Sequence, residues 1–100
     1  MDFQSFRRSL ADSAPPQALD DALRALWWDA KGDWQEAHRC AQTDDTKRGA
    51  WVHAYLHRKE GDAANAGYWY RRTGRSAPEA SLPAEWEAIA RALLAESTAP

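Results

Sequence analysis

Residues 51–72 read Trp51-Val52-His53-Ala54-Tyr55-Leu56-His57-Arg58-Lys59-Glu60-Gly61-Asp62-Ala63-Ala64-Asn65-Ala66-Gly67-Tyr68-Trp69-Tyr70-Arg71-Arg72. Gly61 and Asp62 divide this segment into two helices. Glycine adopts the left-handed conformation that closes a helix, and aspartate caps the helix that follows. The segment therefore predicts an antiparallel helical hairpin that carries aromatic, histidine and arginine side chains together.

The same pattern occurs once more, earlier in the chain. Residues 26–41 contain Gly32 and Asp33 at the equivalent positions. In both segments an alanine, Ala37 or Ala66, follows the glycine by five positions, and a small side chain there lets two helix axes approach closely. The sequence therefore predicts two hairpins of the same design.

The composition favours helices packed around aromatic side chains. The 100 residues include six tryptophans, three tyrosines and two phenylalanines, and each such side chain can bury about 150–250 Å². Val52 and Ile89 are the one valine and the one isoleucine, and so few β-branched residues argue against a sheet. A chain of this length forms one domain and can bury a core without disulfides. We therefore expect an all-α fold, a single compact domain of five to six helices.

Gly, Pro and Asp residues set the expected helix boundaries. The two hairpins are expected at about residues 18–42 and 46–73, with capping helices at about 2–12 and 83–96. The second helix should begin near Gln17, which places Asp20 and Asp21 in its first turn, where the helix dipole favours acidic side chains.

The third helix should begin with a capping box. Asp33 precedes it, and Glu36 lies at the distance from which its side chain can reach back to the Asp33 amide.

One cysteine, Cys40, is present, so an intramolecular disulfide is excluded. A lone cysteine is typical of a reducing compartment, and its alanine neighbours indicate a small buried hydrophobe. The N-terminus lacks a basic region followed by an apolar run, and the longest wholly apolar run, residues 25–28, is far shorter than a membrane span. We therefore expect a cytoplasmic protein with no membrane partner.

The two hairpins resemble tetratricopeptide and Sel1-like repeats, in which helix pairs turn at a Gly-Asp or Gly-Asn and a small residue follows. The resemblance covers roughly residues 18–78, and Pro78 lies where a tetratricopeptide unit often ends. It implies two central hairpins of this type and a surface for a protein or peptide. The segment 51–58 also looks like a motif of short bacterial proteins of unknown function, which implies no activity.

Three residues of the fourth helix, expected at about residues 46–60, share a stripe at i, i+4 and i+7: His53, His57 and Glu60. Two histidines one turn apart can share a metal ion, and Glu60 is a candidate third ligand. His38 is a further candidate if the third helix faces this edge. The segment lacks the His-Glu-x-x-His pattern that places a catalytic carboxylate between two histidines.

A second stripe, Asn65, Tyr68 and Arg72, lies at i, i+3 and i+7 on the fifth helix. If it faces the histidines across the hairpin, the combined edge of His53, His57 and this stripe would bind a carboxylate or phosphate, with Arg72 as the anchor. Alternatively, these side chains hydrogen-bond one another and the helix ends across a packed edge. Burial of the five side chains distinguishes the two interpretations.

The charge distribution is uneven along the chain. Residues 47–75 carry a net charge of +5, whereas residues 1–46 and 76–100 carry −4 and −3. This pattern indicates either neutralisation between packed segments or a basic face for an acidic partner.

Three further residues are candidates for a partner interface. Trp28 lies opposite the apolar stripe of its helix, so it is either covered by another helix or available as an interface anchor. Arg71 and Arg75 lie beside aromatic side chains, an arrangement that can bind nucleic acid. The acidic pI of about 5.9 and the lack of a nucleic-acid-binding motif argue against that partner.

The function expected from these patterns is binding rather than catalysis. A protein- or peptide-binding helical module is the leading interpretation. The alternative is a protein that binds a small anion or a metal ion, or an enzyme, that uses the His/Asn/Tyr/Arg edge of the central hairpin. We expect no cofactor and assign no catalytic residue, and homodimerisation stays open.

Overall fold

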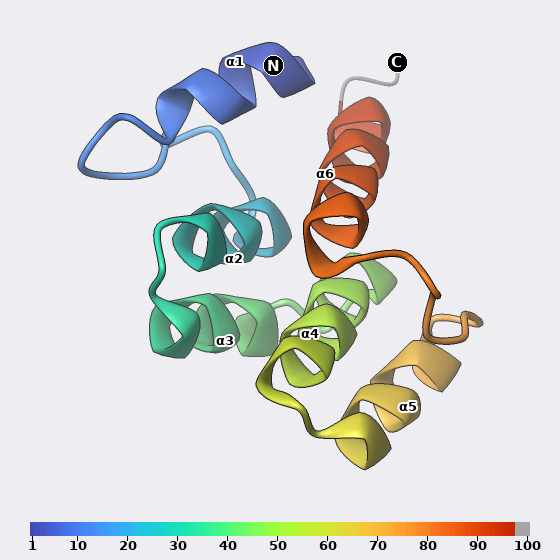
Figure 1. Cartoon of the computed structure of the whole chain (residues 1–100). Helices are drawn as coiled ribbons and strands as arrows, with labels where there is room; N and C mark the ends of the chain where they lie inside the picture. The colour runs from blue at the N-terminus through green and yellow to red at the C-terminus, as the bar shows by residue number, and fades with distance from the viewer. Residues whose placement is uncertain (98–100) are drawn as a thin grey trace.

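The computed structural model describes residues 1–97 and contains six helices in that range. No strand occurs among these residues, as the composition predicted (Figure 1). The helices are α1 (Phe3–Ser9), α2 (Asp21–Ala30), α3 (Trp34–Thr43), α4 (Lys47–Glu60), α5 (Ala63–Arg72) and α6 (Leu82–Ser97). None of them is long and apolar enough to cross a bilayer.

The two Gly-Asp turns have nearly identical geometry. Gly32 and Gly61 adopt φ angles of +87° and +90°, the left-handed conformation that a side chain disfavours. In each turn the aspartate amide donates a 2.9 Å hydrogen bond to the carbonyl five residues earlier, on Trp28 or His57. This bond satisfies a carbonyl at the helix end that would otherwise lack a partner.

Each turn also caps the next helix, as predicted. The carboxylates of Asp33 and Asp62 accept hydrogen bonds from the third amide that follows, at 3.0 and 3.1 Å. The capping box is only half formed, because the Glu36 side chain pairs with Arg39 on its own helix rather than reaching back to Asp33.

Several helix ends differ from the expected boundaries. α2 begins at Asp21 rather than near Gln17, because Asp20 is its N-cap and accepts a 3.0 Å hydrogen bond from the Leu23 amide. α1 is shorter than the expected residues 2–12 and ends at Ser9. At the other end, α6 begins one residue before Pro83, where the Ser81 hydroxyl accepts from the Ala84 amide.

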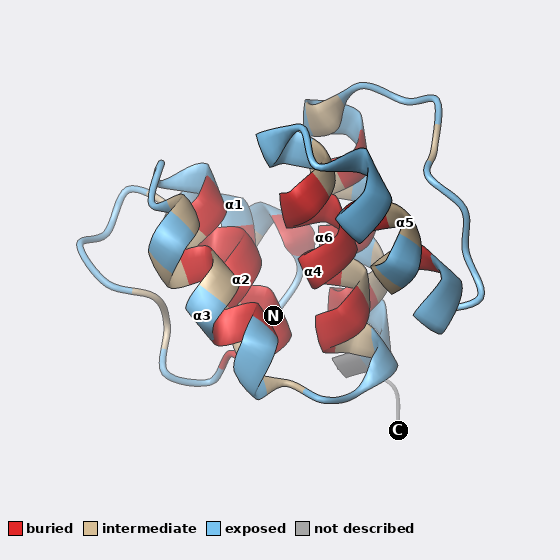
Figure 2. Cartoon of the chain, turned by 90° about the horizontal axis from the view of Figure 1, so that it is seen from below, coloured by how far each residue is buried: buried red, intermediate tan, exposed pale blue. Residues whose placement is uncertain are grey.

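The buried faces of the helices turn inward to form one main core (Figure 2). α6 lies against both α2 and α4, and the Trp86 indole donates a 3.0 Å hydrogen bond to the Leu26 carbonyl. Cys40 is buried, as its alanine neighbours indicated. The largest fully buried side chains are Trp27, Tyr55, Tyr70, Phe6, Leu26, Leu56, Ile89, Leu93 and Val52.

A buried carboxylate joins α2 to α4. Asp29 is 4% exposed. It accepts a 3.0 Å hydrogen bond from the Tyr55 hydroxyl and one of 2.9 Å from the Lys59 ammonium. Burial of the phenol, together with the Asp29 charge, raises the pKa of Tyr55 above its ordinary value. The hydroxyl therefore stays a donor, and the carboxylate is fully partnered.

A second buried carboxylate joins α4, α5 and α6 in the same way. Glu85 of α6 accepts 2.5 Å and 2.7 Å hydrogen bonds from the Tyr70 hydroxyl and the Arg58 guanidinium. Arg58 also donates to the Ala80 carbonyl in the loop before α6. Burial, followed by the contact with Glu85, raises the pKa of Tyr70. Adjacent residues at the end of α4, Arg58 and Lys59, therefore attach two different helices.

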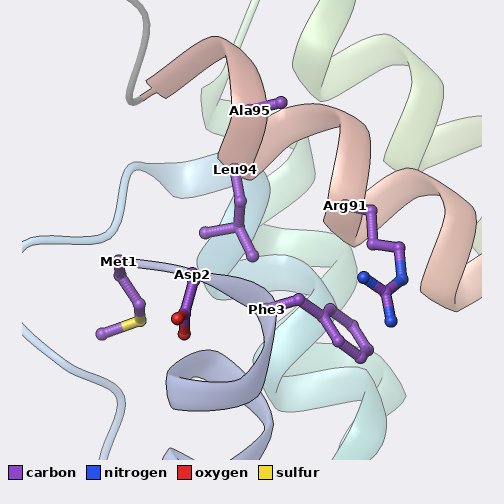
Figure 3. Close-up of a pocket in the computed structure, with 6 residues that line it drawn as sticks. All are labelled: Met1, Asp2, Phe3, Arg91, Leu94 and Ala95. Carbon is purple, nitrogen blue, oxygen red and sulfur yellow. The ribbon is translucent and has the colours of Figure 1, made fainter.

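The start of α1 packs beside α6 and forms a surface pocket of about 340 Å³ (Figure 3). Arg91 lies 4.3 Å from the centre of the Phe3 ring and pairs with Glu87 at 2.9 Å. Asp2 caps α1 by accepting a hydrogen bond from the Ser5 amide at 2.8 Å. The charged side chains of Asp2 and Arg91 in this pocket therefore already have structural roles.

Candidate metal centre

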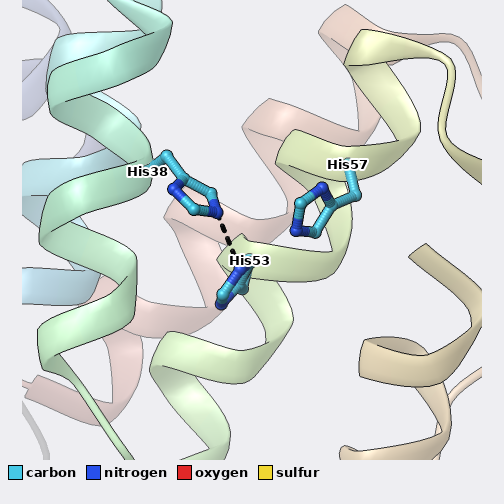
Figure 4. A group of neighbouring side chains, drawn as sticks. All are labelled: His38, His53 and His57. Atoms are coloured by element: carbon cyan, nitrogen blue, oxygen red, sulfur yellow. Dashed lines mark hydrogen bonds between the residues drawn. The ribbon is translucent and has the colours of Figure 1, made fainter. Parts of the chain in front are cut away.

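The three histidines of the chain meet where α3 packs against α4. His53 and His57 lie one turn apart on α4, and His38 reaches them from the middle of α3 (Figure 4). The Nε2 atoms of His38 and His53 are 3.0 Å apart, so one ring donates and the other accepts. One ligating nitrogen from each ring lies within 4.8 Å of the other two. His38, His53 and His57 form the histidine cluster.

Tryptophans hold two of the imidazoles in place. The Trp34 ring stacks on His38 with centroids 4.9 Å apart, and its indole N–H is anchored on the Leu56 carbonyl at 3.0 Å. The Trp69 ring stacks on His53 at 4.0 Å. His53 and His57 are only 5% and 6% exposed, while His38 is half-buried. The cluster is therefore shielded on two sides by flat apolar surfaces.

Glu60 orients His57. Its carboxylate lies 2.5 Å from Nδ1 of His57, one turn away on α4. That contact leaves Nε2 of His57 as the nitrogen free for another partner. A carboxylate on the outer nitrogen of a histidine fixes the ring orientation and raises its basicity as a ligand in many metal sites.

Two histidines of the cluster, His53 and His38, favour their neutral form because burial lowers the pKa of each. Burial, followed by the neighbouring His38 and His57, lowers the pKa of His53 from its ordinary value of 6.5 to about 4, and the Arg72 charge acts in the same direction. Burial, then the neighbouring His57, also lowers the pKa of His38. Neutral imidazole is the form that donates a lone pair to a metal ion.

The lowered pKa of His53 predicts acid-sensitive stability in the metal-free protein. The unfolded chain takes up a proton at this residue near pH 6.5, whereas the folded chain does so only near pH 4. Unfolding is therefore coupled to proton uptake between these values, and stability falls as the pH is lowered through them. Between pH 7 and pH 5 we expect His53 to account for a loss of about 2 kcal/mol.

Urea unfolding in the presence of a chelator measures this loss, with His53→Phe as the matched variant that keeps a ring against Trp69. The wild type should lose about 2 kcal/mol more than the variant over this pH range. Equal losses in the two proteins would show that His53 does not carry the effect.

The structure brings together only part of the predicted edge. His53 and His57 meet, and Arg72 lies close enough for its charge to act on His53. Asn65 is exposed at the start of α5, where its amide donates to Asp62. Tyr68 is 47% exposed and accepts a hydrogen bond from Arg72 at 3.2 Å. The side chain from α5 that stacks on His53 is Trp69.

His38 completes the cluster in the place for which the sequence suggested Glu60. The predicted metal ligands were His53, His57 and Glu60, whereas the structure gives Glu60 a contact with the outer nitrogen of His57. The spacing of Trp34 and His38, one turn apart, is the pattern that marks this face of α3, but it does not reveal which helix lies opposite.

The predicted interface residues have different surroundings. Trp28 is half-buried and packs edge-on against Trp27, with ring centroids 5.0 Å apart. Arg75 lies over the Trp51 ring at 3.5 Å, and Arg71 is exposed near the end of α5. Both arginines are exposed residues.

Comparisons with protein-family models, with curated proteins and with solved structures found no match to this chain. The functional interpretation therefore rests on the geometry of the histidine cluster and its surroundings.

Proposed function

We propose that this protein binds a divalent first-row transition-metal ion, Zn²⁺ in the simplest case, through His38, His53 and His57. The observation that carries the proposal is the convergence of three imidazoles from two helices, with ligating nitrogens within 4.8 Å of one another. Zn–N bonds of about 2.0–2.1 Å place the nitrogens of a tetrahedral site about 3.3 Å apart. The 3.0 Å separation of two of them is already close to that value.

Three features of the surroundings support a metal ion over a hydrogen-bonded histidine pair alone. Imidazole ligands suit Zn²⁺, Cu²⁺ and Ni²⁺. Glu60 holds His57 with Nε2 free, and the stacked Trp34 and Trp69 restrict the other two rings. Three protein ligands also leave a fourth coordination position for water or a small ligand, as in catalytic zinc sites.

Protein or peptide binding, which the repeat-like hairpins implied, stays a prediction. α6 already covers one side of α2 and α4, so that side is not open to a partner. Among the residues whose exposure the structure describes, the exposed large hydrophobic side chains are Met1 and Tyr68. The geometry therefore gives more support to a metal site than to an apolar docking surface.

The test is titration of the chelator-treated protein with Co²⁺ and Zn²⁺. We expect stoichiometric binding of one ion, with the visible absorption of tetrahedral Co²⁺. His38→Ala should weaken binding at least about 100-fold by removing a ligand, and Glu60→Gln should weaken it about 10–100-fold by releasing the orientation of His57.

The matched control is Asp62→Asn. His57, Glu60 and Asp62 form a second group with suitably close ligand atoms. Asparagine still caps α5 but removes the carboxylate. Unchanged affinity in Asp62→Asn together with loss in His38→Ala supports the histidine cluster. The reverse pattern, or no binding by the wild type, would contradict the proposal, and histidine NMR shifts in the wild type provide a readout that needs no variant.

A further inference from the structure

A pocket of about 330 Å³ adjoins the histidine cluster. Its lining includes Asp44, Asp45 and Thr46 from the turn before α4, and His53, Trp69 and Arg72 from α4 and α5. This volume lies within the usual range for small-molecule sites. His53 belongs both to the pocket and to the cluster, so a ligand in this pocket would contact a metal ligand directly.

Two donors on the α4–α5 side of the pocket suit an acid group. The Arg72 guanidinium lies 4.9 Å from the Trp69 ring and donates to the Tyr68 hydroxyl, but no carboxylate lies within 4.0 Å of it among residues 1–97. Figure 4 shows the second ring nitrogen of His53 pointing away from His38. A metal ion on Nε2 of His53 leaves the proton on Nδ1, which then acts only as a donor.

Two carboxylates on the turn suit an ammonium group. Asp44 accepts hydrogen bonds from the Thr46 amide and hydroxyl at 2.9 and 2.5 Å, which fixes the turn. The turn lies so close to α4 that a Cβ on Gly49 would be 2.2 Å from the Asp44 carbonyl oxygen. Asp45 has no ion-pair partner in the described part of the chain. The pocket therefore presents charges of both signs.

We infer that this pocket binds a small amino carboxylate, with the acid group at Arg72 and at Nδ1–H of His53 and the ammonium group at Asp44 and Asp45. The inference rests on the proposed metal site for one step, the fixing of the His53 proton on the pocket side. Metal and ligand should therefore bind cooperatively, each tightening the other by the same factor, about fivefold or more.

The experiment uses 4-aminobutanoate as the probe, because its large chelate ring competes weakly for free metal. Butanoate and butylamine are the matched compounds that lack one charged group each. Zinc affinity is measured first, and each compound is then titrated by calorimetry into the metal-free and the zinc-loaded protein. We expect 4-aminobutanoate to bind at least about fivefold more tightly to the zinc-loaded protein and more tightly than either matched compound.

Two variants test the acid end and the ammonium end of the ligand separately. Arg72→Gln should abolish binding of 4-aminobutanoate while zinc affinity is retained, because Arg72 is not a member of the histidine cluster. Asp45→Asn should weaken the binding of 4-aminobutanoate. It should leave the binding of butanoate, which is weaker in the wild type, unchanged. Zinc binding of Asp45→Asn should also match the wild type.

The outcomes distinguish this inference from the proposed function. If zinc binds and 4-aminobutanoate does not, or if Arg72→Gln binds the probe as the wild type does, the pocket assignment is overturned and the metal site stands. Butanoate binding as tightly as 4-aminobutanoate would overturn the amino carboxylate class. Failure of the wild type to bind zinc overturns both the metal site and the pocket assignment.

Discussion

Zinc at about one hundred times its dissociation constant should raise the midpoint of thermal unfolding of this protein by roughly 10–20 °C. An ion that binds only the folded state adds about 2.7 kcal/mol of stability at that excess. For a domain of 100 residues, each kcal/mol shifts the midpoint by about 4–8 °C. The effect is large because the histidine cluster joins α3 to α4, so the ligands separate when the hairpins unfold.

Thermal unfolding of the chelator-treated protein with and without zinc measures this shift. His57→Ala should show little or no shift, because it removes a ligand and also leaves Glu60 without its partner. Asp62→Asn is the control and should keep the full shift. A wild-type midpoint that does not move with zinc would contradict a metal site that forms only in the folded protein.

Glu85→Ala should lower the free energy of unfolding by about 3 kcal/mol. The carboxylate is 4% exposed and holds Arg58 and Tyr70 from two other helices. Its removal leaves a mostly buried guanidinium and a buried phenol without their partner, and an uncompensated buried group costs several kcal/mol. Because α6 packs on α2 and α4, the loss should affect the whole domain rather than one helix end.

The matched control lies two residues further along α6. Glu87 pairs with Arg91 at 2.9 Å, but both side chains are about half exposed, and solvent-exposed pairs contribute about 0–1 kcal/mol. Urea unfolding of Glu85→Ala, Glu87→Ala and the wild type compares the two positions directly. If both variants lose the same small amount, the Glu85 contacts do not stabilise the fold as the geometry indicates.

Local chemistry made the hairpins predictable. Gly32 and Gly61 close their helices in the left-handed conformation, and Asp33 and Asp62 cap the next ones, because these preferences act within a few residues. The predicted positions of helix ends that lack a glycine were less accurate. The start of α2 was placed too early because Asp20, expected inside the first turn, caps the helix.

The candidate site was only partly visible in the sequence. His53 and His57 were singled out because i, i+4 spacing places them on one face. Their burial was not apparent, because the helical wheel separates polar from apolar positions and does not show which neighbour covers an edge. Of the stripe expected to meet them, Arg72 lies near His53, whereas Asn65 and Tyr68 are exposed. The side chain that stacks on His53 is Trp69.

The sequence alone determines three properties: the all-helical class, the two Gly-Asp hairpins, and which residues lie one turn apart on the same helix face. All three depend on short-range backbone and side-chain preferences. The tertiary structure alone decided that His38 joins His53 and His57 and that Glu85 is buried against Arg58 and Tyr70. Such contacts depend on the angle and register at which helices pack. Those are set by the fit of many apolar side chains at once, rather than by any local pattern.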